Sequence, residues 1–208
     1  MTAVSDPADN PDTDLSRRRF LTAAVAGVSA AGAAFAITPF ISSWQPSERA
    51  RAMGAPIEFD FSKLQVGQMV TLVWRKQPIY VVRRSLELVQ KLASHNAMLK
   101  DPNSLQSDQP AFAKNTMRSR RADLLVLIGT CTHLGCLPKQ HFEPGEAALG
   151  ADWPGGFFCP CHGSRFDLAG RVINGSPASV NLRVPPYYFK DQNTLIVGLD
   201  GSTSKGAA

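Results

Sequence analysis

The sequence has few cysteines, few aromatic residues and no pronounced excess of charge. Only four cysteines occur in 208 residues, which excludes the disulfide-dense scaffold of a small secreted protein. Aromatic residues make up 8% of the chain, and the basic residues behind its net charge of +5 are scattered and not interleaved with them. We therefore expect no nucleic-acid partner. There is also no internal repeat, and a chain that is 44% hydrophobic can bury one sizeable core beside a tail or an anchor.

Charged residues are absent from the segment 20–44. It exceeds the roughly 20 residues that a helix needs to cross a bilayer, and it follows the arginines of "SRRRFLT" (16–22), a pattern typical of a twin-arginine export signal. We expect residues 1–19 in the cytoplasm, a transmembrane anchor over 20–44, and a soluble part on the periplasmic side of the inner membrane. The alternative is a cleaved signal, because Ala34-Phe35-Ala36 offers an A-x-A site. Retention is favoured because the apolar stretch continues through Ile41.

The segment 45–56 is polar, holds two prolines and has too few apolar residues to bury, so we expect a flexible tether there. Residues 57–208 predict an antiparallel, β-rich domain. Its expected strands are β-branched or aromatic and lie over 57–61, 69–74, 79–84, 124–129, 155–160 and 194–199. The fold class is therefore dominated by β structure, with one short helix and the N-terminal transmembrane helix.

The short helix is predicted over 85–95. Ser85 is its expected N-cap, and Leu86, Val89 and Leu92 would lie on one face. Further along, the basic run 118–121 is expected to be a solvated turn.

All four cysteines fall in two short loops. The first loop, "CTHLGC" (131–136), and the second loop, "CPCHGS" (159–164), together offer six soft ligands. One zinc ion would take only four, and the spacings C-x-H and C-x-C-H fit structural zinc motifs poorly. One arrangement uses all six: a cysteine and a histidine from each loop bind a 2Fe-2S cluster, and the two remaining cysteines form a disulfide. A zinc-stabilised binding module remains an alternative.

The paired motifs C-T-H-L-G-C and C-P-C-H-G-S resemble those of the Rieske iron–sulfur proteins. The two extra cysteines are similar to those of the subtype found in quinol-oxidising cytochrome bc complexes. The export signal, the anchor, "PSERARAMGAP" (46–56) and "DPNS" (101–104) also resemble the iron–sulfur subunits of bacterial ubiquinol–cytochrome c reductases. The resemblance covers nearly the whole chain. It implies a Rieske-type antiparallel β domain with a cluster-binding subdomain at about 130–178.

The resemblance also implies roles for single residues. One Rieske 2Fe-2S cluster would be the cofactor, with Cys131 and Cys159 on the inner iron and His133 and His162 on the outer iron. The remaining roles would be a disulfide between Cys136 and Cys161, a hydroxyl donated to a bridging sulfide by Ser164, and a docking tip and cover formed by Leu134, Gly135, Gly163 and Pro177.

Two positions depart from the family pattern. Phe166 stands where many members have a tyrosine whose hydroxyl hydrogen-bonds the cluster, and Ser179 replaces a second proline of the loop over the cluster. The first departure affects how strongly the cluster attracts an electron, and the second affects the rigidity of its cover.

The resemblance implies an oxidoreductase subunit that carries electrons in a respiratory chain. It would take one electron from ubiquinol at the membrane face, where His162 would contact the quinol, and pass it to a c-type cytochrome by movement of the head. Protons would be released outside, so the complex would translocate protons. Cytochrome b would be a further partner, in a complex expected to be dimeric. An alternative is a Rieske subunit of another exported oxidase, such as arsenite oxidase.

Overall fold

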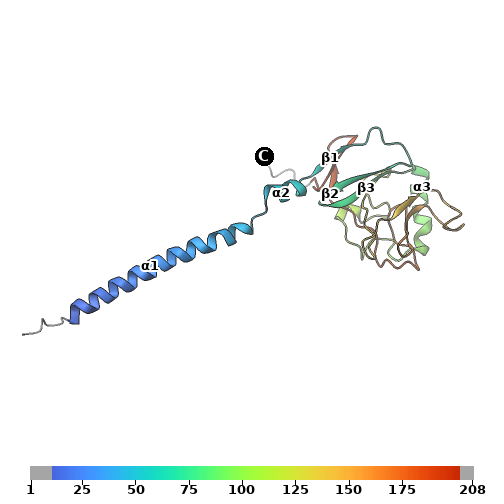
Figure 1. The fold of residues 1–208 in the computed structure, drawn as a ribbon. Helices are drawn as coiled ribbons and strands as arrows, with labels where there is room; N and C mark the ends of the chain where they lie inside the picture. The colour runs from blue at the N-terminus through green and yellow to red at the C-terminus, as the bar shows by residue number, and fades with distance from the viewer. Residues whose placement is uncertain (1–10, 202–208) are drawn as a thin grey trace, which may run out of the picture. The chain divides into compact units, whose positions relative to one another are not determined.

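A computed structural model describes residues 11–201 of the chain (Figure 1). The expectations for residues 1–10 of the cytoplasmic segment and for residues 202–208 of the β domain lie outside the described residues. The chain forms two compact units with the boundary between Arg51 and Ala52. We call the second unit the head.

The first unit is dominated by helix α1 (Pro11–Ser43), which is 33 residues long. At 1.5 Å per residue this is about 50 Å, more than a bilayer core requires. The described residues contain one helix long and apolar enough to cross a membrane by length and composition. Its polar side chains suit such a setting, because the hydroxyls of Thr22 and Thr38 donate to the carbonyls of Arg18 and Ala34 in the preceding turn.

A short helix follows within the expected tether. Helix α2 (Glu48–Gly54) begins after Ser47, whose Oγ accepts a hydrogen bond from the Ala50 N–H at 3.2 Å. This is the bonding pattern of a helix N-cap.

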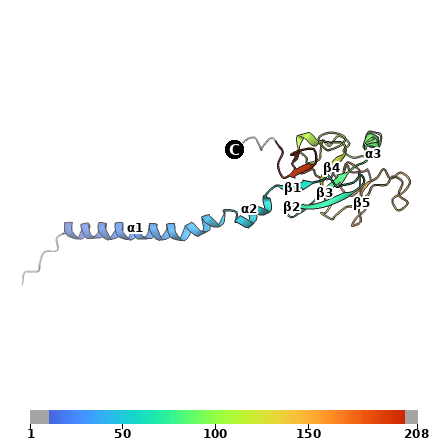
Figure 2. The same cartoon turned by 90° about the horizontal axis from the view of Figure 1, so that it is seen from above.

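The head consists of three antiparallel sheets of three strands each within the described residues. Strands β1 to β5 are labelled in Figure 2. One sheet has the order β1-β9-β8, the second β2-β3-β4 and the third β5-β6-β7. The strands are β1 (Ile57–Asp60), β2 (Met69–Trp74), β3 (Gln77–Arg83), β4 (Leu124–Ile128), β5 (Lys139–His141), β6 (Gly156–Cys159), β7 (Ser164–Asp167), β8 (Tyr187–Phe189) and β9 (Thr194–Val197). The prediction of an antiparallel β-rich domain is confirmed, although β5, β7 and β8 were not expected.

The core lies around β4, whose five residues are all buried. A strand buried on both faces has no polar alternation, which explains its continuous apolar run. Strand β4 pairs with β3 and then leads directly into the first loop. The most deeply buried part of the sheet therefore supports one wall of the candidate site.

The expected helix is present in a shorter form. Helix α3 spans Leu86–Gln90, and the 3-10 helix η1 (Lys91–Met98) continues it; a second 3-10 helix, η2, spans Ala111–Ala113. Val89 and Leu92 are buried whereas Leu86 is exposed, so the three residues do not form a single buried face. Ser85 occupies the N-cap position without a side-chain capping bond.

Three arginines of the head are fully buried: Arg84, Arg118 and Arg171. Burial lowers the pKa of Arg84 and of Arg118 to about 10, so both remain charged at neutral pH. Arg171 pairs with the buried carboxylate of Asp167 at 2.7 Å. The prediction of a solvated turn over 118–121 is therefore wrong at Arg118, which lies inside the protein.

These arginines connect the long segment between α3 and β4 to the chain that follows β7. Arg84 donates to the carbonyls of Ala122 and Leu168, whereas Arg118 donates to the Leu182 carbonyl at 2.6 Å. Arg171 donates to the Leu92 carbonyl at 2.7 Å. Charge-assisted bonds of this kind are strong when buried, so the segment is fixed against the base of the site.

Candidate metal centre

The backbone turns in the same way at the start of each loop. In the first loop the Gly135 N–H donates to the Cys131 carbonyl, and in the second loop the Gly163 N–H donates to the Cys159 carbonyl, each at 2.9 Å. Both glycines are left-handed, with φ of 82° and 77°. A Cβ at either glycine would meet no atom within 4 Å, so their requirement is conformational and not steric. Each loop thus forms a one-turn bend immediately after a cysteine.

The four cysteines form two different pairs. Cys136 and Cys161 are joined by a disulfide that links the loops, with their Cα atoms 6.6 Å apart. Cys131 and Cys159 are free and are only 3% and 1% exposed. Burial raises the pKa of the Cys159 thiol, with a hydrogen bond to the Cys131 thiol acting in the same direction. The two free thiols are therefore buried neighbours.

The two histidines lie closer to the surface. The rings of His133 and His162 are 4.8 Å apart between centroids and nearly perpendicular, at 87°. His162 is exposed, whereas His133 is partly buried and its Nδ1 is a buried atom without a hydrogen-bond partner in the part of the chain that the structure describes. Buried ring nitrogens rarely lack partners, so this atom is available for a ligand.

A metal centre must match this donor set. The sulfur atoms of Cys136, Cys159 and Cys161 lie within 4.8 Å of one another, but two of them are bonded to each other and cannot serve as thiolates. The remaining donors are two buried thiols beside two shallow imidazoles, one with an unpartnered Nδ1. Two sulfur and two nitrogen ligands from paired loops fit a Rieske 2Fe-2S cluster.

Ser164 lies opposite one of the free cysteines. It pairs with Cys159 across strands β6 and β7 and is fully buried. Its Oγ accepts a hydrogen bond from the Ala178 N–H at 3.1 Å, and we find no acceptor for its own proton among residues 11–201. The hydroxyl is therefore free to donate to another group.

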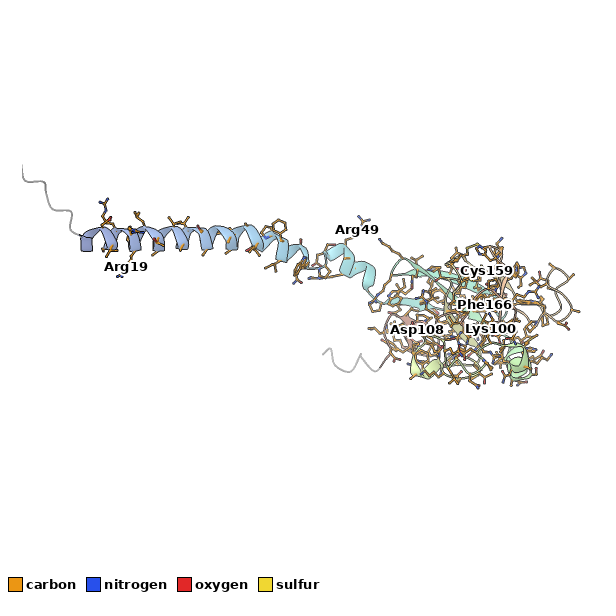
Figure 3. The ribbon with its side chains drawn as sticks, turned by 90° about the horizontal axis from the view of Figure 1, so that it is seen from below. Arg19, Arg49, Lys100, Asp108, Cys159 and Phe166 are labelled. Carbon is orange, nitrogen blue, oxygen red and sulfur yellow. A yellow bond between two sulfur atoms is a disulfide. The ribbon has the colours of Figure 1, made fainter. Side chains whose placement is uncertain are left out.

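Phe166 is also fully buried and lies two residues beyond Ser164 on β7. Alternate residues of a strand share a face, so Phe166 lies on the same face of the sheet as Ser164. Phe157, which pairs with Phe166 on β6, likewise lies on the same face as Cys159. Figure 3 labels Phe166 and Cys159 within the head. The position carries no hydroxyl that could reach a sulfur.

Sequence reasoning did not identify several residues that fix the loops. The hydroxyl of Tyr80 donates to the Pro138 carbonyl at 2.9 Å, which holds the chain just after the first loop. The hydroxyl of Thr132 donates to the Val180 carbonyl at 2.6 Å, which ties the first loop to the segment that follows Pro177. Each bond joins residues 48 or more positions apart, so no local pattern could have revealed it.

The surface around the loops is apolar. Leu134, directly after His133, is 70% exposed, and Leu137, directly after the disulfide cysteine Cys136, is 56% exposed. Pro177 is exposed as well. Exposed apolar groups gathered near a functional centre are typical of a docking surface.

Comparison with known proteins agrees with this chemistry. The model of the Rieske [2Fe-2S] domain matches residues 58–186, and that of the ubiquinol–cytochrome c reductase Fe-S subunit TAT signal matches residues 7–47. The ubiquinol–cytochrome c reductase iron–sulfur subunit of Allochromatium vinosum is 49% identical over 184 residues, covering 88% of this chain and 89% of the relative. The corresponding subunit of Blastochloris viridis is 40% identical over 191 residues, covering 92% and 97%.

A solved structure described as "Hyperthermophilic respiratory Complex III" covers 84% of this chain and 98% of its own at 25% identity, with a TM-score of 0.46. The family model and the identity to the curated relatives are sufficient: the chain belongs to the Rieske [2Fe-2S] family, among the iron–sulfur subunits of ubiquinol–cytochrome c reductase.

Proposed function

We propose that this protein is the membrane-anchored electron-transfer subunit of a proton-translocating ubiquinol–cytochrome c reductase. It takes one electron from ubiquinol and passes it to a c-type cytochrome. The observation that carries the proposal is the donor set: two buried free thiols beside two imidazoles, with a disulfide joining the loops that hold them. Membership of the family supports the same function.

The depth of burial of the four ligands supports their assignment to the two irons. Cys131 and Cys159 are the deeper donors and would hold the inner iron, while His133 and His162 would hold the outer iron. When bound, the cluster supplies a one-electron acceptor whose potential is raised by neutral imidazole ligands. The chain contributes the buried setting, the rigid loops and the free hydroxyl of Ser164.

His162 is the residue placed to meet the quinol. It is exposed, unlike the two free cysteines, and ligation through Nδ1 would leave its Nε2 to accept a hydrogen bond from a quinol hydroxyl. The exposed Leu134 and Leu137 would exclude water around that contact and pack against a hydrophobic docking site. The quinol would lose its proton at this histidine, on the outer side.

The N-terminal part of the chain would determine where the protein is located. Helix α1 would anchor the chain in the inner membrane, with the head in the periplasm, as the match to the export-signal model supports. Residues 45–56 would be the tether between anchor and head, and about 130–178 the cluster-binding subdomain. The head would move on this tether between cytochrome b and a c-type cytochrome, in a dimeric complex.

Deletion of the gene tests this function. Membranes from the deletion strain should lose antimycin-sensitive ubiquinol–cytochrome c reductase activity, and the full chain supplied in trans should restore it. The restored chain should also co-purify with a b-type haem. Activity that persists in the deletion strain would contradict the proposal.

Replacement of Phe166 by tyrosine should raise the midpoint potential of the cluster. A hydroxyl that donates to the sulfur of Cys131 stabilises the reduced state, which carries one more negative charge. A net gain of about 1 kcal/mol corresponds to an increase on the order of 40 mV for one electron. EPR-monitored redox titration of the variant and the wild type would measure the change.

Phe158→Tyr is the matched control. Phe158 is on the opposite face of β6 and packs with a separate group of core residues around Trp153, so its new hydroxyl should leave the potential unchanged. An unchanged or lower potential in Phe166→Tyr, or an equal increase in both variants, would contradict the tuning role of position 166.

A further inference from the structure

The segment 175–180, which we call the cover segment, contains one proline and is held by a lysine from a distant part of the chain. The Lys100 ammonium donates to the Ser176 carbonyl at 2.6 Å and to the Ala178 carbonyl at 2.8 Å. The two carbonyls lie on either side of Pro177. Proline fixes only its own φ, so these bonds restrain the residues that Pro177 does not.

Lys100 is itself firmly placed. Its N–H donates to the Val172 carbonyl at 3.0 Å, and the preceding Leu99 forms a β-bridge with Ile173. The following Asp101 accepts hydrogen bonds from three backbone N–H groups, and its carbonyl accepts one from the Asn181 side chain at 2.9 Å. Both ends of the lysine backbone are thereby fixed, so less entropy is lost when its ammonium binds the cover segment.

The cover segment reaches the redox site through the bond that Thr132 of the first loop donates to the Val180 carbonyl, and through a second hydrogen bond to Ser164. The Ala178 N–H donates to Ser164 Oγ at 3.1 Å, and Ser164 pairs with Cys159 across β6 and β7. The backbone of Ala178 therefore connects the two side chains. Its N–H donates to the hydroxyl of Ser164, and its carbonyl accepts a hydrogen bond from the ammonium of Lys100. A serine hydroxyl that accepts a fixed N–H has its own proton directed away from that donor.

We infer that Lys100 is a positioning residue of the redox site. Its ammonium holds the cover segment in place, and the cover segment in turn fixes the direction in which Ser164 donates its hydroxyl. The ammonium also adds a positive charge near the site, which favours the more negative reduced state. The expected effect of Lys100 on the midpoint potential rests on the proposed function, whereas its effect on the cover segment does not.

Three variants of the full chain test it. Lys100→Met keeps an unbranched side chain one atom shorter and removes the charge, whereas Lys100→Arg keeps the charge and the ability to donate hydrogen bonds. Lys91→Met is the matched control, because Lys91 lies in η1 and its ammonium makes no hydrogen bond or ion pair with a described residue.

The first measurement is hydrogen–deuterium exchange of peptides that cover residues 175–182, which does not depend on the cluster. Lys100→Met should accelerate exchange about tenfold or more, since two bonds from a charged donor are lost. Lys100→Arg should restore most of the protection, and Lys91→Met should match the wild type. Equal exchange in Lys100→Met and Lys91→Met would overturn the inference.

The second measurement is the midpoint potential by EPR-monitored titration. It should fall in Lys100→Met, recover in Lys100→Arg and stay unchanged in Lys91→Met. In a Ser164→Ala background the fall caused by Lys100→Met should be smaller, because part of it acts through Ser164. Faster exchange with an unchanged potential would also overturn the inference, because Lys100 would then be a structural contact only.

The two failures can be told apart. If the proposed function is wrong, the wild type itself shows no Rieske EPR signal, while the exchange data remain interpretable. If only the role of Lys100 is wrong, the wild-type signal is present and insensitive to the lysine variants.

Discussion

Replacement of Cys159 by alanine is expected to give a full-length chain with no Rieske EPR signal. Cys159 and Cys131 are the two free, buried thiols, and no other free cysteine exists in the chain to replace a lost ligand. An alanine offers no donor atom, so one iron would lose half of its protein ligands. Cys131→Ala should have the same effect. The measurement is iron content together with EPR after reduction by ascorbate.

The disulfide cysteines provide the matched control, since they lie in the same loops. The double variant Cys136→Ala, Cys161→Ala keeps all four proposed ligands and removes only the bond between the loops. With a separation of 25 residues the disulfide contributes about 3 kcal/mol, so the cluster should still assemble but be lost faster on heating. If the double variant had no EPR signal while Cys159→Ala retained one, the assignment of ligand and disulfide cysteines would be reversed.

The second large effect concerns the buried ion pair beneath the site. Asp167→Asn keeps the size of the side chain but removes the charge that faces Arg171, and both residues are at most 1% exposed. Arg84 and Arg118 are buried in the same region and gain charge compensation from Asp167. Removal of one partner of such a pair costs about 3–5 kcal/mol of the free energy of unfolding.

An exposed pair serves as the control. Lys190 and Glu58 lie 2.9 Å apart with more than half of each side chain exposed, so Glu58→Gln should leave the free energy of unfolding almost unchanged. Chemical denaturation of the full chain in detergent would measure both. Equal losses of stability in the two variants would contradict a central role for the buried pair.

Local patterns in the sequence predicted the parts of the fold that depend on local physics. Strands β2, β3 and β4 are long and rich in β-branched residues, whereas β5 and β8 have three residues each, too few for a pattern to emerge. The periodicity of a helix predicts Leu86 on one face with Val89 and Leu92, but Leu86 is the first residue of α3 and is 55% exposed.

Long-range contacts explain what the sequence could not predict. Arg118 belongs to a basic run that resembles a solvated turn, but the backbone carbonyls to which it donates lie 51 to 64 positions away, which no local pattern reveals. Lys100 likewise meets carbonyls 76 and 78 positions away. The function of the paired Cys/His motifs could be predicted from the sequence, because residue type and spacing determine which cluster such motifs bind.

The proposed electron transfer requires that two thiolates and two imidazoles of this chain hold a 2Fe-2S cluster. Pulsed EPR of the reduced full chain tests this requirement directly. We expect a rhombic 2Fe-2S spectrum with strong couplings to two histidine ¹⁴N nuclei, one of which disappears in each of His133→Cys and His162→Cys if a cluster still forms. A spectrum without directly coordinated nitrogen, or a chain that binds zinc and no iron, would contradict it.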